Sequence, residues 1–229
     1  MELRGLRVWA LTDGERYGMD AEVAAIAEAA GSRPCHLAGF SAGATVALAA
    51  ALALGQSVRS VAVLQPAFIG DDDWDPAEAE WRSGWRGVVE SPQPGRTAAF
   101  RELLMRPGLA PPPPNTPPRW DFHDNLLERM LFRDTGFVSA DLAAIHAPVL
   151  AIRGGRSSPR WAAVSRRLGE VCPDAREHVF PHLHHFTPPF RDAPEELAAV
   201  LLALWASGEP GTVPACRSVT EAARPPFGV

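Results

Sequence analysis

Residues 35–48 read CHLAGFSAGATVAL, and a Gly-x-Ser-x-Gly pattern runs through them from Gly39 to Gly43. The apolar run before the pattern predicts a buried strand, and the run after it predicts the opening of a helix. A strand, a sharp turn and a helix in this order place the serine at the apex of the turn. We therefore expect Ser41 to be a nucleophile, and the main-chain N–H of Ala42 to donate to a developing oxyanion. The alternative is a glycine-rich helix entry without activity.

The glycines of the pattern have an expected structural purpose. Small residues at Gly39 and Gly43 are expected to let the strand and the helix approach closely.

Short apolar runs alternate with helical patterns along much of the chain. Strands are expected at residues 6–11, 35–39, 60–64, 149–153 and 177–180, and helices at residues 20–30, 42–54, 159–171 and 194–205. This alternation is typical of stacked βαβ units around a parallel sheet. The expected fold class is therefore α/β.

Residues 71–140 break the alternation. They hold several tryptophans, an acidic run and the proline tract 111–114, which is expected to be an extended connector. Apolar patterns around Phe100 and around Leu127 predict two helices. Because loops of this length are uncommon in compact domains without a function, we expect a helical lid inserted between core segments 1–70 and 141–206. A long irregular surface excursion is the alternative.

The end of the chain differs in composition from the core. Residues 207–229 are rich in Gly, Pro and Ser without periodicity, and they are expected to form a disordered tail.

Three histidines cluster between the last expected strand and the last expected helix, at positions 182, 184 and 185. A serine hydroxyl is a poor nucleophile near pH 7 and needs an adjacent base, which this topology places after the final strand. His184 and His185 are adjacent, and no Asp, Glu or Cys completes a ligand set, which argues against a metal site. We expect no metal and no cofactor.

The sequence resembles the α/β-hydrolase superfamily through residues 36–43, residues 58–64, and residues 148–155 together with 185–188. In that superfamily the final strand is followed by a Gly-x-Gly-His-x-x-Pro pattern, whose histidine falls on His185. The resemblance implies a parallel sheet of the α/β-hydrolase type with an inserted helical lid. It also implies acyl transfer to water through an acyl-serine intermediate, with His185 as the general base.

The chain departs from the superfamily at the third member of the catalytic triad. An Asp usually follows the next-to-last strand in a Gly-x-x-Asp pattern, but residues 154–159 read GGRSSP. Some branches, including thioesterase-like ones, place the acid after the strand that follows the nucleophile helix, where this chain has Gln65. Glutamine can hydrogen-bond the histidine but supplies no charge.

A carboxylate lies close to this position. Asp71 is the candidate, although a solvated charge cluster is the alternative reading of the acidic run that it opens. We expect the orienting group within residues 65–73 and not at residues 157–158.

A second departure lies near the N-terminus. The segment between Thr12 and Ser41 has room for one helix and one strand, so the superfamily's preceding strand and its oxyanion-donor loop have no counterpart. One face of the sheet should then be left to the final helix alone, although parallel sheets are normally covered on both faces. We expect the alternating core residues of segments 6–11 and 60–64 to have no partner layer on that face, leaving an exposed apolar patch. A truncated chain and a degenerate relative are both consistent with this pattern.

Four aromatic residues are candidates for the substrate pocket: Phe40, Trp81, Trp85 and Trp120. Aromatic side chains commonly line such pockets, but packing or exposed roles for the tryptophans are equally consistent. The expected substrate is a small apolar ester. A thioesterase acting on carrier-bound acyl groups is the alternative enzyme, and a catalytically silent binding protein is the alternative of another class.

Composition narrows the choice of partners. The 229 residues are 46% hydrophobic and carry a net charge of −5, which argues against nucleic acid or an anionic membrane as the main partner. The N-terminus has no secretory signal pattern, and the apolar runs are too short to span a membrane. Three scattered cysteines suit neither a disulfide framework nor a metal site. We expect a cytoplasmic protein with a small-molecule substrate.

Overall fold

The computed structural model describes residues 18–90, 95–109 and 134–207. In chain order the helices and strands are α1 (Met19–Ala30), β1 (Cys35–Phe40), α2 (Ala42–Leu54), β2 (Val58–Leu64), α3 (Pro76–Glu90), α4 (Gly95–Leu103), β3 (Val149–Gly154), α6 (Arg160–Val171), β4 (Ala175–Phe180), α7 (Pro189–Asp192) and α8 (Pro194–Ser207). Four of the expected strands and all four expected core helices are present. The expected strand at residues 6–11, the proline tract, the helix near Leu127 and the tail beyond Ser207 lie outside the described residues.

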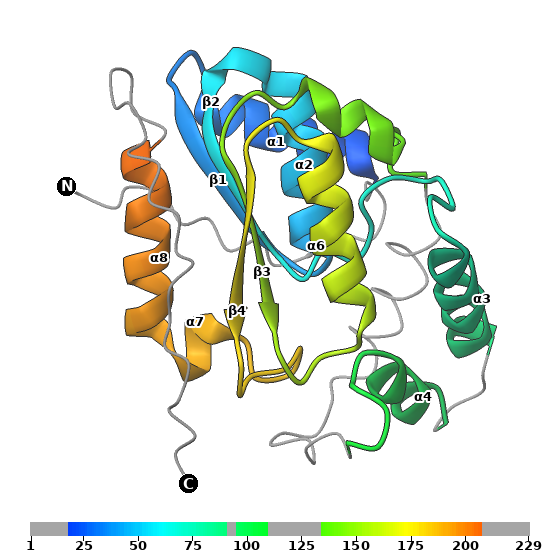
Figure 1. Cartoon of the computed structure of the whole chain (residues 1–229). Helices are drawn as coiled ribbons and strands as arrows, with labels where there is room; N and C mark the ends of the chain where they lie inside the picture. The colour runs from blue at the N-terminus through cyan, green and yellow to red at the C-terminus, as the bar shows by residue number, and fades with distance from the viewer. Residues whose placement is uncertain (1–17, 91–94, 110–133, 208–229) are drawn as a thin grey trace, which may run out of the picture.

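Strands β1 to β4 form one parallel sheet in the order β1-β2-β3-β4. The α/β class with a parallel sheet is thereby confirmed. The carboxyl ends of all four strands meet at one edge, which is where open α/β sheets place their functional groups. Figure 1 shows α8 on one side of this sheet and α1, α2 and α6 on the other.

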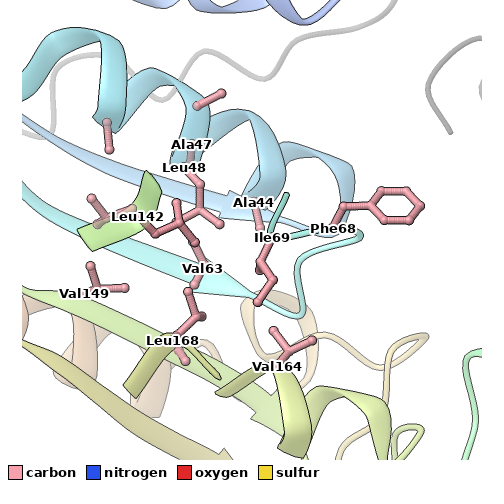
Figure 2. Close-up of a cluster of buried hydrophobic side chains, with 14 of the residues drawn as sticks. Ala44, Ala47, Leu48, Val63, Phe68, Ile69, Leu142, Val149, Val164 and Leu168 are labelled. Atoms are coloured by element: carbon pink, nitrogen blue, oxygen red, sulfur yellow. The ribbon is translucent and has the colours of Figure 1, made fainter. Parts of the chain in front are cut away.

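The first face of the sheet is covered mainly by α2, whose sequence AGATVALAAALAL is almost wholly apolar. Its residues from Ala44 to Ala51 are all buried, since the helix lies between the sheet and other elements. Leu48 and Val63 meet Leu142 and Leu168 in this layer (Figure 2). Helix α2 is therefore anchored along most of its length.

The second face of the sheet carries a smaller apolar cluster. Ala62, Leu64 and Ile152 pack there against Leu197 and Leu204 of α8. The expectation of an exposed apolar face at residues 60–64 is therefore wrong. Ala62 is fully buried and Leu64 is 5% exposed, because α8 covers this face.

Helices α3 and α4 occupy part of the segment expected to be a lid, and they pack against each other outside the sheet layers (Figure 1). The carboxylate of Glu78 in α3 is buried and accepts two hydrogen bonds from Arg160 at the start of α6, over 2.7 and 2.8 Å. The guanidinium of Arg160 also lies 3.8 Å from the ring centroid of Trp81. This ion pair docks α3 on the core.

Candidate active site

Ser41 lies between β1 and α2 with φ of 55° and ψ of −121°. A positive φ is uncommon for a residue with a side chain, and it costs about 1–3 kcal/mol that the surrounding structure must offset. Two main-chain bonds hold the turn: Ser41 N donates to the carbonyl of Leu64 over 2.9 Å, and Ala67 N donates to the carbonyl of Ser41 over 3.1 Å. The expected strand, strained turn and helix are all present.

Only one glycine of the pattern is needed for close approach. A Cβ atom at Gly39 would collide with the main chain of Gly43 and Ala44, whereas a Cβ at Gly43 would meet nothing within 4 Å. The interpretation that both glycines serve close packing is therefore corrected. Gly39 faces the first turn of α2, while Gly43 is exposed on the outside of that turn.

The N-terminal end of α2 faces the same site. Ala42 is the first residue of the helix, so its N–H has no partner within the helix and can donate to a bound oxygen. The positive end of the helix dipole also favours negative charge at this point. The side chain of Thr45 exchanges two 2.9 Å hydrogen bonds with the main chain of Phe68, which ties the loop after β2 to the helix. This anchoring role of Thr45 was not predicted.

His185 follows β4, and its side chain is buried between two aromatic rings. The ring centroids of Phe40 and Trp161 each lie 4.8 Å from that of His185, with interplanar angles of 29° and 6°. Trp161 is fixed in turn by a 3.0 Å hydrogen bond from its indole N–H to the carbonyl of Pro66. Burial, followed by the charge of His184, lowers the pKa of His185 to about 3. The imidazole is therefore neutral at ordinary pH.

Glycines also let the histidine loop approach the sheet. A Cβ at Gly154 would collide with the main chain of Leu183, and a Cβ at Gly155 would collide with that of Pro181. Both contacts lie just before His185 in the loop. The loop position therefore depends on these two glycines at the end of β3.

Gln65 orients the ring of His185. The amide oxygen of Gln65 lies 2.9 Å from Nδ1 of His185, and the buried hydroxyl of Ser157 donates to the same oxygen over 3.2 Å. An amide oxygen only accepts hydrogen bonds, so Nδ1 carries the proton and Nε2 keeps its lone pair. Gln65 itself has a positive φ of 47°, as Ser41 does. The expected contact between His185 and the 65–73 segment is thus made by its first residue.

Asp71 is bound elsewhere. Its carboxylate accepts hydrogen bonds from the main-chain N–H groups of Thr135, over 2.7 Å, and of Gly136, over 3.1 Å. The neighbouring Asp72 similarly accepts from the main-chain N–H and the hydroxyl of Ser139. The expectation that Asp71 assists His185 is therefore corrected, because both acids fasten the returning chain to the core.

Ser41 and His185 lie in the same neighbourhood, since Phe40 directly precedes the serine and stacks on the imidazole. Among the hydrogen bonds between described residues, His185 has one with Gln65 and none with Ser41. Such contacts are often long before a substrate binds. His184 is also buried, but its Nδ1 accepts from the N–H of Phe186 within the loop. Of the two, His185 is the one that contacts Gln65.

A row of aromatic rings leads from α3 to His185. Phe68, Trp81, Trp85, Phe100 and Phe186 contact one another in that order, with ring centroids 5.4 to 6.1 Å apart. Phe186 then lies edge-on to His185 at 5.5 Å.

The four residues predicted to line the substrate pocket do not share one environment in the structure. Trp81 and Trp85 are buried within this row, and Phe40 contacts the histidine directly. Trp120 lies outside the described residues. Trp161 and Phe186 were not predicted as site residues. Only their contacts with His185 in the folded protein identify them as such.

The described part of the chain contains neither a cluster of metal ligands nor a membrane-spanning helix. No group of three or more His, Cys, Asp or Glu side chains there could hold a metal ion. In residues 18–90, 95–109 and 134–207, no helix is long and apolar enough to cross a bilayer.

A parallel sheet with a strained serine after β1 and a buried histidine after β4 defines an α/β protein of the hydrolase type. The chain belongs to the alpha/beta hydrolase family, whose model matches residues 3–200. Membership of this family supports the assignment of the protein as a hydrolase. No curated protein matches the sequence.

Several solved structures share the fold. A hydrolase from Pseudomonas aeruginosa is 19% identical with a TM-score of 0.54, covering 82% of this chain and 72% of that one. Proline iminopeptidase from Mycobacterium smegmatis is 19% identical with a TM-score of 0.51, covering 86% and 74%. Naproxen esterase from Bacillus subtilis is 15% identical with a TM-score of 0.52, covering 82% and 66%. At these identities the likeness concerns the fold.

Proposed function

We propose that this protein is a serine-dependent hydrolase of carboxylic esters. Ser41 is the nucleophile, His185 the general base, Gln65 the group that orients the base, and the N–H of Ala42 an oxyanion donor. The observation that carries the proposal is the 2.9 Å contact between Gln65 Oε1 and His185 Nδ1. It leaves Nε2 as the nitrogen able to accept the serine proton.

In the proposed reaction the hydroxyl oxygen of Ser41 attacks the ester carbonyl while its proton passes to Nε2 of His185. The carbonyl oxygen becomes negative in the tetrahedral intermediate and accepts a hydrogen bond from Ala42 N–H. The protonated histidine then gives its proton to the leaving alcohol, and an acyl-serine remains. Water attacks the acyl-serine by the same steps and releases the acid.

The amide at position 65 limits the expected rate. A carboxylate would stabilise the imidazolium that forms during attack, whereas the neutral amide of Gln65 only fixes the ring and its tautomer. The burial that lowers the pKa of His185 to about 3 acts in the same direction, since it opposes protonation of the base. We therefore expect slow turnover.

Thioester hydrolysis is the second candidate. Gln65 occupies the place where thioesterase-like branches of the superfamily carry their acid, and it is the residue that contacts His185. A thiolate also leaves without needing a proton, so it demands less of a weakly basic histidine. Measuring kcat/KM for an oxygen ester and a thioester with the same acyl group distinguishes the two activities.

Labelling with a fluorophosphonate probe tests the proposal. The wild-type protein should label at Ser41, while Ser41→Ala should not label and His185→Ala should label far more slowly. Ser83→Ala removes an exposed serine on α3 and should label as the wild type does. A protein that melts cooperatively but takes no label would instead be a silent binding protein.

A further inference from the structure

Five buried side-chain polar atoms have no hydrogen-bond partner in the described structure, and all five are N–H donors. They are the indole nitrogens of Trp74, Trp81, Trp85 and Trp205 and the Nε of Arg101. A buried donor without an acceptor is costly, and native proteins rarely keep one without a reason. Arg101 is the one charged side chain among these five; its Nε is buried, although the residue as a whole is partly exposed.

Arg101 lies close to the catalytic histidine. Its guanidinium carbon is 5.2 Å from the ring centroid of Phe186, and Phe186 lies edge-on to His185 at 5.5 Å. The cation is thus separated from the imidazole by the span of one aromatic ring. No carboxylate among the described residues pairs with it.

Three other arginines in the neighbourhood have acceptors, whereas Arg156 is exposed to solvent. Arg82 and Arg160 share the carboxylate of Glu78, and Arg191 bonds to Asp192 and to the carbonyl of Phe186. Arg101 therefore differs from them in having a ring contact but no acceptor.

The electric field of the histidine loop is consistent with a bound anion. After burial, the charges of Arg156, Arg191 and Arg101 all act to lower the pKa of His184, and Asp192 alone acts to raise it. The loop next to Phe186 therefore lies in a net positive field. An anion placed there would gain from several charges at once.

Arg101 is also joined to the row of aromatic rings. Its neighbour in α4, Phe100, contacts both Trp85 and Phe186 at 5.4 and 6.1 Å. The unpartnered indole donors of Trp81 and Trp85 belong to the same row. Apolar rings beside unpartnered donors suit a ligand with a carbon chain and an acceptor-rich end.

We propose that Arg101 binds an anionic group of the substrate, a carboxylate or a phosphate, while the aromatic rings hold the carbon chain that links it to the scissile ester. The proposal rests on the proposed ester hydrolysis, and it changes the expected substrate from a wholly apolar ester to one with an acidic end.

Three p-nitrophenyl esters of similar length test this specificity: the pentanoate, the mono-ester of glutarate and the 4-phosphonobutanoate. The wild type should show a higher kcat/KM for at least one anionic ester than for the pentanoate, and the better of the two identifies the anion. A hydrogen bond to a charged group corresponds to about 10- to 100-fold in binding. Arg101→Gln should reduce the ratio of anionic to neutral kcat/KM by about that factor.

Two further variants sharpen the comparison. Arg101→Lys keeps the charge and should retain part of the preference. Arg106→Gln removes an exposed arginine just beyond α4 and should leave the ratio unchanged. Equal kcat/KM for all three esters in the wild type would overturn the proposal while leaving ester hydrolysis intact.

A binding experiment separates this proposal from catalysis. Calorimetry on Ser41→Ala, which lacks the nucleophile, should show tighter binding of monomethyl glutarate than of methyl pentanoate. The double variant Ser41→Ala, Arg101→Gln should lose that difference. Equal binding of the two ligands would refute the anion site whatever the serine probe reports, whereas a failure of labelling alone would refute only the hydrolase.

Discussion

The amide oxygen of Gln65 accepts the Nδ1 proton of His185 over 2.9 Å. Ser157 Oγ donates to the same oxygen and holds the amide from its other side. Gln65 therefore supplies orientation without charge. In the proposed mechanism this contact takes the place of the triad acid, fixing the ring of His185 without a carboxylate.

Restoring the charge should increase activity. Gln65→Glu places a carboxylate against Nδ1, so it should raise the pKa of His185 and stabilise the imidazolium. Replacing the acid by an amide lowers turnover about 10⁴-fold in serine proteases, so we expect a gain of about 10²-fold in kcat here. The acidic limb of the pH profile of kcat/KM should move to higher pH. Gln56→Glu adds the same charge at an exposed turn and should change neither quantity.

Removing the polar group should have the opposite effect. Gln65→Leu keeps much of the side-chain volume but leaves Nδ1 without an acceptor, and the labelling rate of Ser41 should fall. If both position-65 variants labelled at the wild-type rate, the orienting role would be wrong.

The stability of the protein should fall at mildly acidic pH because of His185. Its pKa is about 6.5 in the unfolded chain and about 3 in the folded protein, so the unfolded state binds the proton first. Burying the ring in its neutral form therefore costs no stability above pH 6.5. The free energy of unfolding decreases as pH falls from 6.5 toward 3, because protonation then favours the unfolded state. Between pH 7 and 5.5 this amounts to about 1 kcal/mol of unfolding free energy.

Denaturant unfolding at the two pH values measures this effect. The wild type should lose about 1 kcal/mol more than His185→Asn, which has no titrating ring. His182→Asn removes an exposed histidine from the same loop and should behave as the wild type does. Equal losses in the wild type and His185→Asn would show that the buried ring does not resist protonation.

The two glycines beside Ser41 should differ sharply in their tolerance of alanine. Gly39→Ala forces a methyl group into the main chain at Gly43, where neither strand nor helix can yield cheaply. We expect a loss of about 3 kcal/mol or more in unfolding free energy, at the upper end of overpacking effects. Gly43→Ala meets open space and should melt within a few degrees of the wild type. Similar melting temperatures for the two variants would contradict the close approach.

Breaking the buried ion pair should destabilise the docking of α3. Glu78→Gln removes the charge that faces Arg160 while leaving the guanidinium buried, which typically costs about 3–5 kcal/mol. Glu80→Gln neutralises an exposed carboxylate on the same helix and should cost little. Protection of α3 amides from hydrogen exchange should decrease in the first variant and not in the second. Unchanged protection in Glu78→Gln would show that α3 docks without the pair.

The sequence by itself determined the fold class and the strand, turn and helix around Ser41. The local spacing of apolar residues predicts strands and helices. The Gly-x-Ser-x-Gly pattern is contiguous in sequence, and its strand and helix lie directly on either side of it. The same local signals predicted β1 to β4 and the helices between them. The order of the same segments places His185 after the last strand, as the structure has it.

Only the tertiary structure decided which polar groups meet. Gln65 and Asp71 are near neighbours along the chain, yet one contacts His185 and the other binds the loop at Thr135, since the main chain turns at Gln65 with a positive φ. The packing of Trp161 on His185, the completeness with which α8 buries Ala62 and Leu64, and the unpartnered Nε of Arg101 likewise have no local signature. Each of these features depends on contacts between segments that are far apart in sequence. The apolar periodicity of one segment does not reveal which other segment packs against it.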